Sequence, residues 1–155
     1  MALELAKTVK FGVTARLSTR DIIRRTVALL DEIGFQSLWA GDHIAFTSPI
    51  LDPMLGLSQA LAHSDTLTVG TGVYLLPLRS AAAAAKLASS LDHLSEGRFI
   101  FGIGAGGEFP REFAACGVPL KERGQRMTEG IEVLKKLWSG KPVSHAGRIW
   151  RFEDV

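Results

Sequence analysis

The chain has 155 residues, of which 46% are apolar and 22% charged; these proportions exclude disordered and collagen-like chains and fit a globular domain with a real core. Eighteen basic and 16 acidic residues give a formal net charge of +2 with no basic block, so we do not expect nucleic acid as a partner. No apolar run approaches the ~20 residues of a membrane span, and the first 13 residues do not resemble a signal peptide. The single cysteine, Cys116, fits a reducing compartment. We therefore expect a cytoplasmic protein without membrane contacts.

The first half of the chain predicts two strand-helix units. Residues 10–15 form a short β-prone run, after which Ser18 or Thr19 caps a helix with apolar residues at helical spacing that Gly34 ends. Residues 37–40 (SLWA) predict a second strand, and Asp52 with Pro53 predicts the start of a helix that runs to about residue 63.

The second half repeats the pattern twice and then changes. Residues 67–72 (LTVGTG) predict a third strand, and the alanine-rich residues 80–94 have very high helix propensity. Residues 99–104 (FIFGIG) predict a fourth strand, followed by a glycine-rich loop that crosses to residue 119 and a long amphipathic helix over residues 121–138. Residues 143–152 alternate and turn at Ala146-Gly147, which predicts a hairpin.

The spacing of these strands limits the architecture. Strand starts near residues 10, 37, 67 and 99 are 27, 30 and 32 residues apart, which is the period of a βα unit in a parallel sheet covered by helices. A doubly wound sheet would be complete at about this length, whereas a (β/α)8 barrel needs ~250 residues and would be represented here by its first four units. Length alone favours the doubly wound sheet.

In both architectures function lies at the carboxyl ends of the strands. After the first strand Arg16 is either a solvated charge, which we favour, or an anion contact. Asp42 and His43 follow the second strand directly, and an imidazole there can accept or donate a proton near neutral pH, although a structural histidine fits equally well.

The other two strand ends are rich in glycine. Residues 70–73 (GTGV) predict a bulge or a close approach of backbone to a ligand, although tight helix packing explains them equally well. Residues 102–107 match G-x-G-x-x-G, whose backbone amides can hold a phosphate or a flat ring, but the fourth strand is the wrong place for a dinucleotide fingerprint. Glu108 and Glu112 follow, each either a site carboxylate or a surface charge.

Several of these segments together resemble the luciferase-like monooxygenase family. They occur in its order and spacing, and the resemblance covers nearly the whole chain: residues 37–43 (SLWAGDH), 69–73 (VGTGV), 91–98 (LDHLSEGR) with 102–106 (GIGAG), 113–119 (FAACGVP), 123–127 (RGQRM) and 134–138 (LKKLW). The resemblance implies an α/β fold of the (β/α)8 TIM-barrel type. We therefore expect residues 1–155 to form a single domain, a half barrel of four N-terminal βα units plus the C-terminal hairpin.

The resemblance also implies a cofactor, either coenzyme F420 or FMN. The segment that ends at Arg79 (LLPLR) and the RGQRM segment are closer to the F420-dependent branch, so we expect F420, with FMN as the alternative. By the same resemblance His43 handles protons beside the ring, and the bulge at Gly72 and Val73 carries a non-prolyl cis peptide bond that supports the ring.

The resemblance implies further residues that contact the cofactor ring or supply a proton. Glu108 is the expected catalytic acid, with Glu112 as the alternative because this loop is one residue longer than is common. The expected cofactor-binding residues are Asp42, Thr71, Gly72, Val73, Gly104, Ala105, Gly106 and Gly107, and no metal site is expected.

These expectations lead to two functional hypotheses. The first is an oxidoreductase or monooxygenase in which a small organic substrate exchanges hydride with the cofactor. The second is a truncated, non-catalytic half barrel that functions only by assembling with another chain, because the family's fifth to eighth strands would begin after Val155 and the first and fourth strands would be unpaired edges. We expect a homo-oligomer, namely a dimer, because unpaired strand edges favour pairing with another chain.

Overall fold

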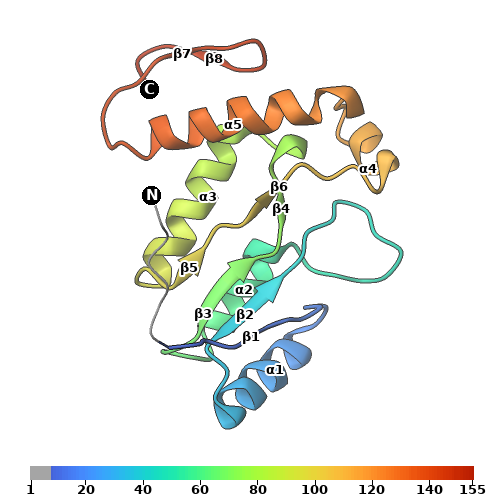
Figure 1. Cartoon of the computed structure of the whole chain (residues 1–155), viewed down its shortest axis with the longest axis vertical. Coiled ribbons are helices and arrows are strands. Elements are labelled where there is room, and N and C mark those ends of the chain that lie inside the picture. The colour runs from blue at the N-terminus through green and yellow to red at the C-terminus, as the bar shows by residue number, and fades with distance from the viewer. Residues whose placement is uncertain (1–7) are drawn as a thin grey trace.

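The strands of the four predicted units lie side by side in one parallel sheet (Figure 1). In the computed structural model, which describes residues 8–155, the strand order β1-β2-β3-β5 follows the chain order. A doubly wound sheet would reverse its order at a switch point. The sequential order instead confirms the first half of a (β/α)8 barrel. The first seven residues, which form part of the segment weighed above as a signal peptide, lie outside the described range.

The elements alternate as the sequence predicts, with additional short strands and helical turns. The strands are β1 (Gly12–Thr14), β2 (Ser37–Ala40), β3 (Thr68–Thr71), β4 (Tyr74–Leu75), β5 (Phe99–Ile100), β6 (Ile103–Gly104), β7 (His145–Ala146) and β8 (Arg151–Phe152). The α-helices are α1 (Arg20–Ile33), α2 (Pro53–Leu61), α3 (Ala81–Leu94), α4 (Pro110–Ala115) and α5 (Arg123–Leu137), and the 3₁₀ turns are η1 (Leu76–Leu78) and η2 (Leu120–Glu122). None of the helices in residues 8–155 is long and apolar enough to cross a bilayer.

The helix ends form where the capping residues predict them. The Thr19 hydroxyl accepts a hydrogen bond from the Ile22 N–H, and Gly34 ends α1 in the left-handed conformation at φ 76°. Asp52 caps α2 in the same way ahead of Pro53. Because these ends are set by local chemistry, the sequence alone is sufficient to place them.

The core lies between the helices and one face of the sheet. Alternate strand residues point into it, with Leu38 and Val69 fully buried, and α2 adds Leu57. Alanines along α3 allow close packing against α5. This packing fixes the carboxyl ends of β2, β3 and β6, where the candidate site lies.

Two features of the fourth unit differ from the prediction. The expected strand over residues 99–104 is interrupted at residues 101–102, because its halves pair with different strands: β5 pairs with β3, and β6 pairs with β4 beyond the third-strand bulge. The glycine-rich loop also contains α4, which begins at Pro110. This helix supplies Glu112 to the site.

The C-terminal hairpin is confirmed, but its turn spans residues 147–150 instead of Ala146-Gly147. Glu129 of α5 explains the wider turn, because its carboxylate accepts hydrogen bonds from the N–H groups of Arg148, Ile149 and Trp150 at 2.8–3.2 Å. The hairpin lies against the side of α5 away from the sheet (Figure 1). At its base Val143 and Val155 exchange two backbone hydrogen bonds of 2.9 and 3.1 Å.

We expect Glu129→Gln to reduce the loss of the free energy of unfolding that occurs when the pH is lowered. Burial of Glu129 raises its pKa, but the Trp150 and Ile149 N–H groups and His145 outweigh burial and hold the pKa below 4.5. A depressed carboxyl pKa contributes stability that is present above pH 4.5 and lost as pH falls through the folded-state value. Urea unfolding at neutral and acidic pH measures this loss. Exposed Glu132→Gln on the same helix is the control, and equal acid dependence of both variants would contradict the prediction.

Candidate active site

A cavity of about 420 Å³ opens at the carboxyl ends of the central strands. Three segments form its walls: residues 41–43 after β2, the bulge after β3, and the glycine-rich loop with the start of α4. This is the position at which βα barrels carry their active sites. The lining contains every site residue expected from the sequence except Thr71: Asp42, His43, Gly72, Val73, Gly104, Ala105, Gly106, Gly107 and Glu108.

The wall after β3 is a bulge. The peptide bond between Gly72 and Val73 is cis, as the family resemblance implies. Backbone hydrogen bonds hold both sides of the bulge, from the Gly72 N–H to the Ala40 carbonyl and from the Tyr74 N–H to the Gly102 carbonyl, each 2.8 Å. Val73 lines the cavity and lies against Gly104. A methyl group at residue 104, as in alanine, would collide with the valine side chain. The bulge and the glycine-rich loop therefore fit together only without a side chain at residue 104.

We expect Gly104→Ala to lower the free energy of unfolding by about 1–3 kcal/mol through overpacking against Val73. Gly124→Ala is the matched control, because a methyl group at residue 124 would meet no atom within 4 Å other than its chain neighbours and its own helix backbone, and alanine favours a helix. Chemical denaturation of both variants measures the difference. Equal stability of the two variants would show that the bulge adjusts freely.

The glycine-rich loop presents backbone instead of side chains to the cavity. Gly106 and Gly107 have φ angles of 63° and 125°, which side chains other than glycine disfavour. Among residues 8–155, the N–H groups of Ala105, Gly106 and Gly107 donate to no backbone carbonyl. A loop of this kind can contact a flat ring closely and donate hydrogen bonds to its polar edge. These residues fit a flavin or deazaflavin ring.

His43 and Glu112 form a directly contacting pair at the end of the cavity. His43 Nδ1 lies 3.2 Å from Glu112 Oε2, and the glutamate is 3% exposed. Oε1 of Glu112 accepts hydrogen bonds from the N–H groups of Ile44 and Ala45, at 2.7 and 3.0 Å. The carboxylate thus fixes both the loop after β2 and the His43 ring, and it favours a proton on Nδ1.

Aromatic rings pack around the same histidine. Phe46 stacks on His43 with centroids 4.1 Å apart and planes 10° from parallel, and Phe109 meets it edge-on at 5.1 Å. The two phenylalanines also contact each other at 5.4 Å. This packing restricts rotation of the imidazole and shields it from water. Neither phenylalanine is predicted as a site residue, because an aromatic residue in a loop carries no specific signal.

Beneath this site lies a buried ion pair. Arg79 reaches Asp42 through two nitrogens, at 2.6 and 2.8 Å, and the Asp42 side chain is fully buried. The Leu75 N–H also donates to Asp42, at 2.8 Å. Arg79 lies over the Tyr74 ring at 4.3 Å, and burial raises the pKa of Tyr74 to about 12. The ion pair ties the loop after β2 to the segment after the third-strand bulge.

The expected site residues therefore occupy different environments. Glu108 lines the cavity but is exposed, whereas Glu112 is buried and contacts His43. The carboxylate of Asp42 accepts hydrogen bonds from Arg79 and from the Leu75 N–H. Thr71 is fully buried and donates its hydroxyl hydrogen bond to the Gly102 carbonyl, so it supports the bulge from behind.

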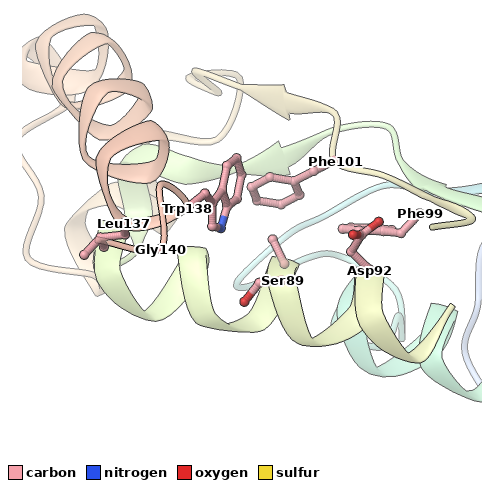
Figure 2. A pocket seen from close by; sticks show the side chains of 8 residues that line it. Ser89, Asp92, Phe99, Phe101, Leu137, Trp138 and Gly140 are labelled. Atoms are coloured by element: carbon pink, nitrogen blue, oxygen red, sulfur yellow. The ribbon is translucent and has the colours of Figure 1, made fainter. Parts of the chain in front are cut away.

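A larger cavity of about 560 Å³ lies elsewhere, between the last turns of α3 and α5 and the start of β5 (Figure 2). Phe99, Phe101 and Trp138 line it together with Ser89 and Asp92. The C-terminal ends of helices in βα units lie near the amino ends of the strands, the end of a barrel associated with stability. We therefore place the site at the smaller cavity.

Comparison with known proteins agrees with this geometry. Residues 8–155 match the family model of the luciferase-like monooxygenases. The chain is 30% identical over 126 residues to the oxygenase component of the flavin-dependent trigonelline monooxygenase of Acinetobacter baylyi, covering 80% of this chain and 35% of that one. It is 31% identical over 148 residues to an F420-dependent glucose-6-phosphate dehydrogenase of Intrasporangium calvum, covering 88% and 43%.

Among solved structures, the monooxygenase RslO1 from Streptomyces bottropensis superposes with a TM-score of 0.86 at 26% identity, covering 95% of this chain and 48% of that one. The chain thus spans between a third and a half of the length of these relatives.

Proposed function

The chain belongs to the luciferase-like monooxygenase family. We therefore propose that it forms the part of the active site that contacts the cofactor ring in a flavin- or deazaflavin-dependent oxidoreductase acting on a small organic substrate. The observation that carries this proposal is the joint construction of one cavity from His43 with Glu112, the cis bulge at Gly72 and the glycine-rich loop. We propose F420 as the cofactor on the basis of the LLPLR and RGQRM segments, with FMN as the alternative, since one relative is named F420-dependent and another flavin-dependent.

Different residues of this chain would hold the cofactor ring and handle protons. The bound ring supplies the redox chemistry. Residues 105–107 offer N–H groups to the ring, the Ala105 methyl group is the one side chain in residues 104–107, and Val73 supports the ring from the bulge. Glu112 holds the proton of His43 at Nδ1, which leaves Nε2 with a lone pair to accept a proton. We propose Glu112 as the positioning carboxylate and retain Glu108 as a candidate acid at the exposed rim.

Absorbance titration of the purified chain with F420 and with FMN tests the proposal. We expect a perturbed cofactor spectrum with a Kd of about 10–100 µM, which Ala105→Trp abolishes by filling the cavity. Ala82→Trp, at an exposed position of α3, is the matched control and retains binding. An unperturbed spectrum with both cofactors would refute the proposal for this chain.

The assembly hypothesis also has a specific observation in its favour. Among the described strands, β1 and β5 each pair on one side only within the main sheet. Phe11 beside β1 is 60% exposed and Ile100 in β5 is 46% exposed. Unpaired apolar edges favour pairing with another chain. We propose a dimer on this basis, and a monomeric mass in solution at micromolar concentration would contradict it.

A further inference from the structure

A second cavity shares the His43 side of the site. It has a volume of about 210 Å³ and lies at the carboxyl ends of β1 and β2, under the loop of residues 44–51. His43 lines both this cavity and the one assigned to the ring. A hydrogen bond of 2.8 Å from the Leu51 N–H to the Leu17 carbonyl ties the loop to the end of β1. Molecules held in the two cavities would therefore meet at one imidazole.

The lining of the second cavity is mostly apolar. Six of its ten residues are apolar: Ala15, Leu17, Ala40, Phe46, Ile50 and Leu51. Its volume lies below the ~300 Å³ at which pockets for drug-sized ligands begin. The cavity therefore fits a small compound with a hydrocarbon body.

Arg16 is the one permanent cation in that lining. Its Nη1 donates to the Ser48 hydroxyl at 3.0 Å, and within residues 8–155 no carboxylate lies within 4 Å of its guanidinium. A guanidinium carries five N–H donors in a planar fork, so four remain after the bond to Ser48. That fork matches the two oxygens of a carboxylate.

We propose that this second cavity is the substrate site and that the substrate is a small apolar carboxylate. Arg16 binds the carboxylate and the reacting end of the molecule faces His43; the assignment as substrate rests on the function proposed above. A carboxylate suits the site better than a phosphate, because a phosphate carries close to two charges and the lining offers no second permanent cation.

Binding of cyclohexanecarboxylate and of its neutral isostere cyclohexanecarboxamide, followed by NMR without cofactor, tests the proposal. We expect the acid to bind at least about tenfold more tightly than the amide, with shifts at the Leu17, Ile50 and Leu51 methyl groups. Arg16→Gln should remove the preference for the acid and leave amide binding unchanged, and Arg16→Lys should retain part of it. Arg20→Gln, an exposed arginine in α1, is the control.

The outcomes separate this inference from the proposed function. Equal affinities for acid and amide in the native chain, an undiminished preference in Arg16→Gln, or shifts located elsewhere would each overturn the carboxylate site, whatever the cofactor titration shows. A preference that depends on Arg16, in a chain that binds neither F420 nor FMN, would support the carboxylate site and overturn the proposed function.

Discussion

Asp42→Ala is expected to lower the free energy of unfolding by about 3–5 kcal/mol, because it removes the buried, two-pronged partner of Arg79 and leaves only the more distant Asp52 beside that charge. The Leu75 N–H loses its acceptor in the same variant. Urea unfolding followed by circular dichroism measures the effect. We also expect the loop after β2 to lose its fixed position, since Asp42 connects it to the segment that follows the bulge.

Two further variants test the origin of this loss. Asp52→Asn removes the more distant carboxylate, 3.4 Å from Arg79, while asparagine still caps α2, so its effect should stay below about 1 kcal/mol. The double variant Asp42→Leu with Arg79→Met removes both charges and should be more stable than Asp42→Ala alone. A double variant as unstable as the single one would indicate lost packing instead of an unpaired charge.

Glu112→Gln is expected to invert the tautomer of neutral His43. The carboxylate beside Nδ1 favours a proton on that nitrogen, whereas the amide nitrogen of glutamine donates toward it and favours a proton on Nε2. Long-range ¹H–¹⁵N NMR of the imidazole distinguishes the two forms. In a cofactor-loaded enzyme the variant should slow proton transfer by about 100-fold, the lower end of what a general acid or base contributes.

Glu112→Ala removes the acceptor of two backbone N–H groups as well and should cost about 2–3 kcal/mol of stability. Glu108→Gln is the matched control in the same loop, because Glu108 is exposed, whereas the hydrogen bond to His43 comes from Glu112. We expect it to leave the His43 tautomer unchanged. A tautomer change in Glu108→Gln and none in Glu112→Gln would reverse the roles assigned to the two glutamates.

The sequence was sufficient for the elements whose signals are local. Thr19 and Gly34 delimit α1, and Asp52 with Pro53 begins α2, as their capping chemistry predicts. The sequence also predicts that the functional residues follow the carboxyl ends of the parallel strands, and the cavity opens at those ends. In contrast, the interruption of the fourth strand depends on pairing beyond the bulge, and register between strands cannot be inferred from a single strand.

The contacts that fix the site were the least predictable part. Asp42 and Arg79 are 37 residues apart, and His43 and Glu112 are 69 apart. Nothing in either local pattern identifies its partner. The sequence predicts an irregular loop around Glu112 although Pro110 is a helix-start signal, and without α4 it leaves the choice between Glu108 and Glu112 open. The prediction of the hairpin turn at Ala146-Gly147 is wrong for a similar reason, since a carboxylate from α5 selects the turn.

The closed base of the hairpin has a consequence for insertions. Because Val143 and Val155 bond to each other in both directions, the chain returns at residue 155 to the point that it left at residue 143. Closing a segment of another length between these two residues costs only about 0.6 kcal/mol per doubling of its length. A peptide can therefore be inserted in this segment without moving Val143, provided that the turn held by Glu129 is kept.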